Sequence, residues 1–191
     1  MVLTELHYLP LVSYFSRIKN NDFQIEAYEH YQKQSLRNRT YILSSSGELI
    51  LTIPIQHGAT TIQEVKIDYS QDWVKNHIRA LQSAYKHSPY FDYYFPYFED
   101  IYQRKLPFLF NLNLELFLLI IKMLKWQKGV CLTKEFVPNY ESQIQDIRSK
   151  YQYREAQSNT PYQQVFGNEF IPNLSILDLL FNKGPDAYLF L

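Results

Sequence analysis

The stretch from Leu112 to Trp126 constrains the fold more than any other part of the sequence. One narrow stripe at helical spacing carries Glu115, Lys122 and Lys125, together with Asn111 just before the stretch, and mainly apolar residues occupy the rest of the circumference. A helix with this pattern touches water along a single line and is buried on its other sides. The pattern therefore predicts a fold whose other elements pack around helix 112–126.

The N-terminal half favours strands, because apolar and polar residues alternate there with a period of two. Phe23–Ala27 is the clearest case, and a Ser-Ser-Ser-Gly sequence after Leu43 predicts a hairpin turn. The elements expected in this half are strands at 6–9, 23–27, 39–43, 49–55 and 65–68, with a short helix at 11–18. Strand, helix and strand in succession are the opening of an α/β unit.

From Trp73 onward the apolar period becomes helical. The elements expected here are a helix from 73, a helix within 90–102 that begins near Pro96, helix 112–126, a strand at 132–136, a polar helix at 143–151, a loop at 153–163 and a last helix at 176–182. Ser175 and Asp178 have the spacing of a capping box for the last helix, which accounts for Asp178 structurally.

These elements predict one fold class. We expect an α/β (or α+β) single domain over residues 1–191, with an N-terminal β-rich, mixed-sheet half and a C-terminal helical half packed around helix 112–126. Neither an internal repeat nor a low-complexity linker divides the chain, and 191 residues are enough to bury a core without disulfides or a metal.

The charge balance restricts the partners. Nineteen Lys and Arg residues match nineteen Asp and Glu residues, which argues against a nucleic-acid partner, because such partners require a field of one sign. The most apolar run, Leu116–Ile121, is far shorter than the roughly 20 residues that span a bilayer. The N-terminus lacks the basic region of a signal peptide, so we expect a cytoplasmic protein without a membrane span.

No cofactor or metal is expected. The five histidines lack metal-ligand spacing, and the sequence contains neither a CxxC motif nor a glycine-rich phosphate loop. The single cysteine, Cys131, is expected to be a small buried thiol, although a nucleophilic cysteine is the alternative.

The polar run Tyr31–Arg39 is the strongest candidate for a binding site, because it places cations and amides between two predicted strands. Arg37 and Arg39 are two residues apart, so on an extended chain their guanidinium groups point to the same side and Asn38 points to the other. Two guanidinium groups on one face can bind a phosphate or a carboxylate. Alternatively, they belong to an exposed strand face and form surface ion pairs worth about 0–1 kcal/mol each.

His77 lies between Trp73 and Leu81 on the apolar face of its predicted helix. It is either a core histidine that is hydrogen-bonded to a carbonyl, or a general acid or base on the inner side of the helix. His57, which precedes Gly58 in a loop, could flank the same pocket or be a solvated loop residue.

Several short segments, in their order and spacing, resemble the WbqC-like proteins over residues 8 to 187. These segments are Tyr14-Phe15, Tyr31 to Arg39, Ile53-Pro54, Ile67 to Trp73 with His77, Ala84-Tyr85, Ser88 to Phe91 and Asn173 to Leu180. The family's R-N-R element falls on Arg37, Asn38 and Arg39, and its Trp-to-His helix motif falls on Trp73 and His77. Leu36 stands where an aromatic residue is expected in many relatives.

The resemblance implies a bacterial protein of sugar-related biosynthesis, since the family is named after surface-polysaccharide (O-antigen) gene clusters. Together with the residues, it suggests a transferase that binds an anionic small molecule, either a nucleotide sugar or an acyl donor. Arg37 and Arg39 would hold the anionic group, Gln32 and Asn38 would hydrogen-bond the sugar, and His77 would exchange a proton with the acceptor.

The rival hypothesis is a non-catalytic binding or scaffold protein that recognises a glycan or a partner protein. An enzyme should have a concave pocket with convergent polar groups, whereas a scaffold should have a flat exposed aromatic patch.

Overall fold

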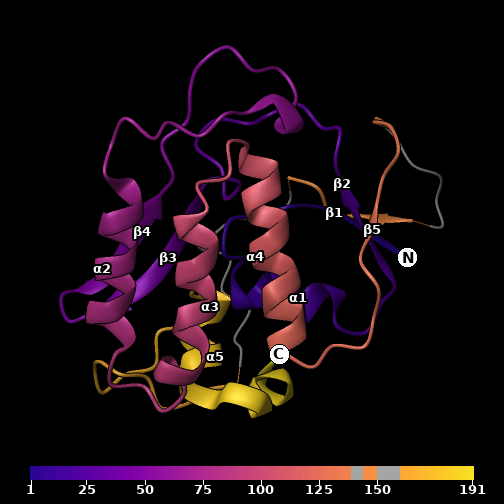
Figure 1. Ribbon diagram of the computed structural model, residues 1–191. Helices are drawn as coiled ribbons and strands as arrows, with labels where there is room; N and C mark the ends of the chain where they lie inside the picture. The colour runs from indigo at the N-terminus through magenta and orange to yellow at the C-terminus, as the bar shows by residue number, and fades with distance from the viewer. Residues whose placement is uncertain (139–143, 150–159) are drawn as a thin grey trace.

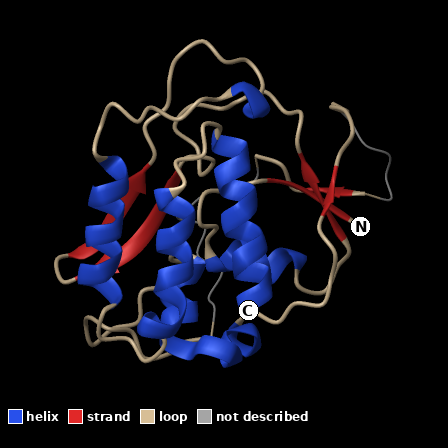
Figure 2. Cartoon of the chain, in the orientation of Figure 1, coloured by secondary structure: helices blue, strands red, loops and turns tan. Residues whose placement is uncertain are grey.

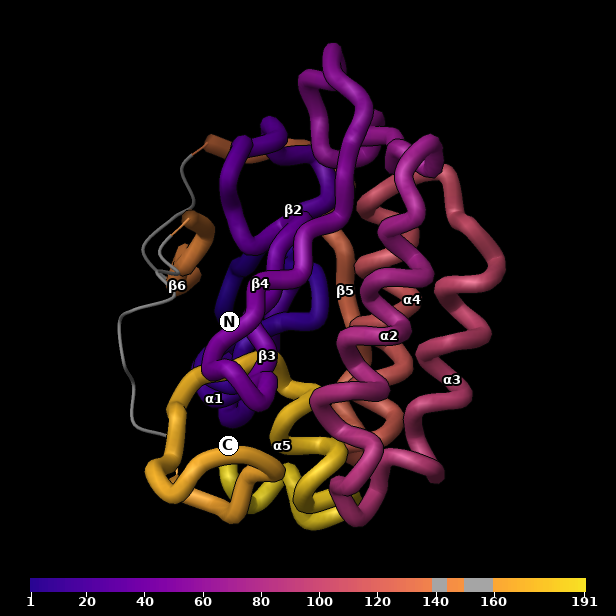
Figure 3. Tube along the Cα trace, turned by 90° about the vertical axis from the view of Figure 1, so that its left-hand side faces the viewer, coloured from indigo at the N-terminus to yellow at the C-terminus, as the bar shows by residue number. Residues whose placement is uncertain are grey.

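The computed structural model of the protein describes residues 1–138, 144–149 and 160–191. Within these ranges the chain forms a mixed α/β fold with a four-stranded parallel sheet, a separate antiparallel hairpin and five α-helices, which confirms the expected fold class. Helices α2 (Trp73–Tyr85), α3 (Phe91–Gln103) and α4 (Leu109–Met123) lie side by side (Figure 1), and a view turned by 90° places them on one side and the strands on the other (Figure 3).

The parallel sheet contains β1 (Val2–Glu5), β2 (Phe23–Glu26), β5 (Cys131–Leu132) and β6 (Gln145–Asp146) in the order β5-β2-β1-β6. It lies beside the N-terminus in Figure 2. Helix α1 (Val12–Ile18) connects β1 to β2, which pair in register from Val2 opposite Phe23. In chain order, β2 and β5 are added to the sheet on one side of β1, and β6 is added on the other side. The direction in which successive strands are added therefore reverses between β1 and β6.

The antiparallel hairpin agrees with the prediction. Strands β3 (Arg39–Ser44) and β4 (Gly47–Thr52) pair across a two-residue loop, with Ser44 opposite Gly47. Gly47 has φ +104°, a conformation that favours glycine, which explains its place in this turn.

Helix α4 is central, as its sequence pattern predicts. Phe117 contacts the rings of Tyr14 and Phe15 on α1 and of Phe23 on β2, so α4 joins the parallel sheet to the helical layer. The helix begins at Leu109 and ends at Met123, three residues earlier at both ends than expected.

Helix α3 does not begin near Pro96, as expected, but contains it. Phe91, Phe95 and Phe98 are buried on one face and hold the helix on both sides of the proline, whose own side chain is exposed. Helix α5 (Ile176–Lys183) ends at Lys183 and is followed directly by a 3-10 helix (Gly184–Phe190). A shorter 3-10 helix spans Ile62–Glu64.

Several strand predictions were wrong in position or type. The first strand is Val2–Glu5 rather than 6–9, because Leu9 has φ +41° and cannot continue a strand. Residues 65–68 make only isolated bridges, and the late strand is limited to Cys131–Leu132. The described part of the expected helix at 143–151 contains strand β6 instead, while residues 143, 150 and 151 lie outside the described ranges.

Two smaller predictions were also wrong. Cys131 is exposed rather than buried, since it lies on the edge strand of the parallel sheet. The Ser175 hydroxyl caps α5 by accepting a hydrogen bond from the Leu177 N–H at 3.3 Å, but Asp178 does not complete a capping box. The Ser175 N–H already donates to the Tyr41 carbonyl, and the buried Asp178 carboxylate instead accepts hydrogen bonds from Tyr162 and Gln164.

Candidate functional site

A cavity of about 310 Å³ lies at the carboxyl ends of β1 and β6. Its lining comes from the end of β1 and the residues after it, the 32–37 turn, the start of β3 and the residue three positions after β6; these residues are Glu5, His7, Gln32, Lys33, Gln34, Ser35, Leu36, Arg37, Arg39, Tyr41 and Ser149. Ligands of open parallel sheets bind outside the carboxyl ends of the strands, where the strand order reverses. The reversal between β1 and β6 places the cavity at that position.

Arg37 lines the cavity as a structural residue, because its charge is already paired with Glu29. Only 1% of the residue is exposed, and its guanidinium group donates to both oxygens of Glu29, with Nε 2.6 Å from Oε1 and Nη2 in contact with Oε2. Burial by itself would lower the pKa of Arg37, but the hydrogen bonds and charge of Glu29 outweigh this effect and raise it. Arg37 therefore stays cationic and fixes the 32–37 turn against Glu29.

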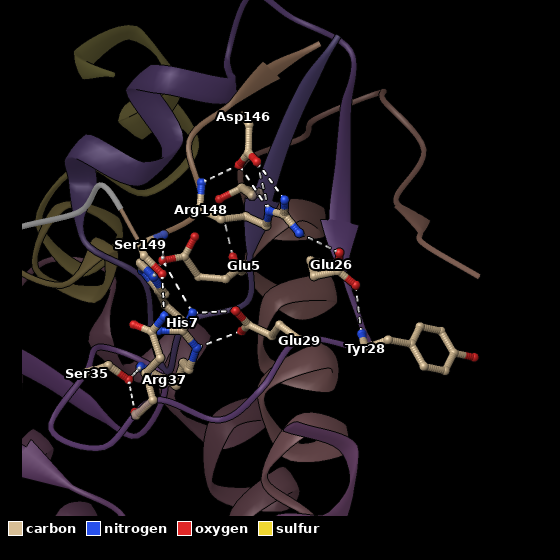
Figure 4. A network of polar contacts seen from close by, with 12 residues as sticks. Glu5, His7, Glu26, Tyr28, Glu29, Ser35, Arg37, Asp146, Arg148 and Ser149 are labelled. Atoms are coloured by element: carbon tan, nitrogen blue, oxygen red, sulfur yellow. Dashed lines mark hydrogen bonds and ion pairs between the residues drawn. The ribbon is translucent and has the colours of Figure 1, made fainter. Parts of the chain in front are cut away.

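Glu5 and His7 form a buried acid–imidazole pair in the same cavity (Figure 4). His7 Nε2 lies 3.2 Å from Glu5 Oε1, which also accepts a hydrogen bond from the Ser149 N–H at 2.9 Å. Burial favours a raised pKa for Glu5, but the hydrogen bond and charge of His7, with the charge of Arg37 3.9 Å away, hold it below its ordinary value. The carboxylate is thus ionised, and its Oε2 is buried without a hydrogen-bond partner among the described residues.

A second ion-pair group holds the segment after β6 against the sheet. The Arg148 guanidinium contacts Glu26 at 3.0 Å and Asp146 at 2.6 Å, and it donates to the Val137 carbonyl at 3.0 Å. Glu26 is fully buried at the end of β2. Figure 4 shows the Arg148 guanidinium between Asp146 and Glu26. This clamp fixes the backbone N–H of Ser149 that contacts Glu5.

Arg39 differs from Arg37, because the described residues leave it available for a ligand. It opens β3, lines the cavity and is half-buried. Its Nε is buried without a hydrogen-bond partner in the part of the chain that the structure describes. Gln32, from the turn, donates from Nε2 to the Ser149 hydroxyl at 2.8 Å, and the exposed Lys33 adds a further positive charge beside it.

The structure brings three of the residues predicted for the site into one cavity, namely Gln32, Arg37 and Arg39. Asn38 is buried instead, and its Nδ2 donates to the Ile53 carbonyl at 2.9 Å, so it ties the turn to the chain after β4. The binding roles of these residues stay predictions.

His77 lines a different cavity, of about 510 Å³, between β4 and α2. Its Nδ1 lies 2.8 Å from the Tyr8 hydroxyl, which in turn lies 2.5 Å from the Tyr102 hydroxyl. Burial lowers the pKa of His77 to about 4, although a hydrogen bond to the backbone of Thr52 opposes the shift. The ring is therefore neutral at pH 7 and has the contacts of a core histidine, while a catalytic role for it stays a prediction.

Sequence reasoning missed Glu5, His7 and Glu29. A signal exists for the first two, since two residues separated by one lie on the same side of an extended chain, and both follow an apolar pair that can form a strand. Glu29 carries no local signal, because its role depends on Arg37, eight residues later and across a turn.

The described ranges contain neither a metal-binding cluster nor a membrane-spanning helix. No group of three or more His, Cys, Asp or Glu side chains there could hold a metal ion. None of the described helices is long and apolar enough to cross a membrane.

Comparisons with known proteins give matches that extend over nearly the whole chain. The model of the WbqC-like protein family matches residues 6–149 and 138–189. A Mycobacterium tuberculosis (strain ATCC 25618 / H37Rv) protein with the name "Uncharacterized protein Rv1507c" is 28% identical over 221 aligned positions, which cover 98% of this chain and 95% of that protein. No solved structure matches the chain significantly. Because the family model matches nearly the whole chain, the protein belongs to the WbqC-like family.

Proposed function

We propose that the protein is a transferase of bacterial surface-polysaccharide or activated-sugar biosynthesis, and that the cavity beside β1 and β6 holds the anionic group of a sugar or acyl donor. The observation that carries the proposal is Arg39, whose buried Nε lacks a partner among the described residues. A buried donor without an acceptor is costly, and an anionic ligand would supply the acceptor.

The surrounding charges support an anion at Arg39 rather than at Arg37. Glu29 accepts hydrogen bonds from Nε and Nη2 of Arg37 and offsets the charge of the guanidinium group, so Arg37 is poorly suited to bind an anionic ligand. Arg39 and Lys33 lie on the turn and strand side of the cavity, where a phosphate or carboxylate would meet both cations. Gln32 would add a neutral donor next to them.

The pair of Glu5 and His7 provides the proton chemistry that a transfer requires. When the acceptor hydroxyl or amine attacks the donor, the bond from the transferred group to the nucleotide phosphate or the coenzyme A thiol breaks, and the phosphate or thiol leaves. The acceptor also loses a proton, which a positioned carboxylate–imidazole pair can take. His77, which lines a separate cavity, is not required for this step.

The proposal is tested by ligand-dependent thermal stability with UDP-glucose and acetyl coenzyme A as probes of the two donor classes. A ligand present at 100 times its Kd stabilises the folded protein by about 2.7 kcal/mol, which corresponds to a rise in Tm of about 5–10 °C for a chain of this size. We expect at least one probe to produce such a shift, and Arg39→Gln to abolish it.

Arg79→Gln is the matched control, because Arg79 is an exposed arginine on α2 outside the cavity lining. It should leave the shift unchanged. A shift that survives in Arg39→Gln, or no shift with either probe in the wild type, would contradict the proposed donor site.

The alternative, a non-catalytic binding or scaffold protein, would use Tyr93 and Tyr97, which lie one turn apart on α3 and are 71% and 58% exposed as residues. Tyr93→Ser with Tyr97→Ser separates the two functions. On the transferase proposal, this double variant keeps the ligand-induced shift.

A further inference from the structure

The cavity has walls of opposite charge, and this feature goes beyond an anion receptor. The turn and the start of β3 contribute Lys33 and Arg39, whereas the sheet side contributes Glu5. An anionic ligand alone would satisfy the first wall and be repelled by the second.

The acidic side carries more carboxylates than guanidinium groups. Among the described residues drawn in Figure 4, two guanidinium groups, those of Arg37 and Arg148, form ion pairs with four carboxylates, and the imidazole of His7 pairs with one of these, Glu5. The four carboxylates are Glu5, Glu26, Glu29 and Asp146. Each arginine has its closest contacts with an acid other than Glu5: Arg37 with both oxygens of Glu29, and Arg148 with Glu26 and Asp146. Glu5 has Arg37 only at 3.9 Å.

The two oxygens of Glu5 differ. Oε1 interacts with His7 and the Ser149 N–H, while Oε2 is buried without a hydrogen-bond partner in the described part of the chain. Glu5 is 99% buried as a residue, since only 1% is exposed, and it lines the cavity. An ionised buried oxygen of this kind requires a donor, and a cationic donor would also offset its charge.

We infer that the ligand bound in this cavity carries a protonated amine beside its anionic group, with the amine on Glu5 Oε2 and the anionic group on Arg39. The chemical class is an amino-substituted sugar or similar small molecule that bears a phosphate or carboxylate. The volume of about 310 Å³ suits a group of that size. The inference rests on the proposed function, because it names the substrate class of the same site.

The test is isothermal titration of the whole chain at pH 7 with glucosamine 6-phosphate, glucose 6-phosphate, N-acetylglucosamine 6-phosphate and inorganic phosphate. We expect glucosamine 6-phosphate to bind about tenfold or more tightly than glucose 6-phosphate, because a charge-assisted hydrogen bond replaces a neutral one. The N-acetyl probe keeps the N–H but loses the charge, so it should lose the same factor. This comparison needs only the wild-type protein.

Variants then assign the effect. Glu5→Gln should reduce the preference for the amine to about twofold or less, while Arg39→Gln should weaken all phosphorylated probes by similar factors and preserve their order. Glu48→Gln, an exposed acid on β4 outside the cavity, is the matched control and should change nothing.

The outcomes separate the two proposals. Phosphates that bind through Arg39 with equal affinity for the amine and hydroxyl probes would overturn this inference and leave the anion site intact. Binding that does not depend on Arg39, or no binding of any phosphorylated probe, would overturn the proposed function as well. If Glu5→Gln does not fold, the ratio among the three sugar phosphates on the wild type still decides the inference.

Discussion

Replacing Arg37 with methionine should destabilise the protein strongly, because Arg37 is the cation of a buried ion pair rather than a free ligand-binding group. The substitution keeps an unbranched apolar stem but removes both hydrogen bonds to Glu29 and the positive charge that lies 3.9 Å from Glu5. Removing one partner of a buried pair costs about 3–5 kcal/mol. For a chain of 191 residues this corresponds to a fall in Tm of about 6–20 °C.

Urea denaturation followed by circular dichroism measures the effect, and a double-mutant cycle assigns it. Arg37→Met with Glu29→Met should recover most of the loss, because an apolar pair of similar volume removes the uncompensated carboxylate. Arg79→Met, at an exposed position on α2, should change the free energy of unfolding by less than about 0.5 kcal/mol. A loss below about 1 kcal/mol for Arg37→Met, or a double variant no more stable than the single one, would refute the structural role.

Two further predictions concern stability. His77→Gln should flatten the acid side of the stability profile, because the pKa of His77 in the folded state, about 4, lies below its ordinary value of 6.5. The unfolded state therefore binds more protons, and His77 costs the wild type about 2 kcal/mol of stability between pH 7 and pH 5, measured by urea denaturation against the variant. Equal losses in both proteins would contradict this. Gly184→Ala should lower the Tm by several degrees, since its Cβ would lie 2.4 Å from the Tyr90 ring at φ +55°, whereas Gly129→Ala meets no neighbour and should be neutral.

The elements that the sequence predicts well are those defined by local patterns. The hairpin of β3 and β4 follows from two alternating runs around a glycine turn, and α4 follows from a single polar stripe. Strands β5 and β6, in contrast, have two residues each and exist through pairing with β2 and β1, more than 100 residues away in sequence. No window around them contains that information, which is why 143–151 was expected to be helical.

The residues of the candidate site show the same contrast between features visible in the local sequence and features that depend on tertiary contacts. Arg39 and Gln32 were predicted because a run of cations and amides between strands is visible locally. The difference between Arg37 and Arg39 was not, because it arises from Glu29, which reaches only one of the two guanidinium groups. Spacing predicts that both arginines face one side, but only the tertiary structure shows that the charge of Arg37 is already paired with Glu29.

The loop after β1 connects two separate cavities, one lined by Arg39 and one by His77, although the sequence predicts both residues in one site. His7 lies in the cavity with Arg39, while Tyr8, the next residue, is buried on His77 and Tyr102. The Tyr8 N–H also donates to the Leu36 carbonyl at 3.0 Å, in the turn before Arg37. His77 therefore contacts the residue that anchors this turn, so a substitution at His77 can shift the cavity through Tyr8 without contacting a ligand. A lower rate in a His77 variant therefore does not by itself indicate proton transfer by the imidazole. That conclusion also requires a change in the pH dependence of the activity.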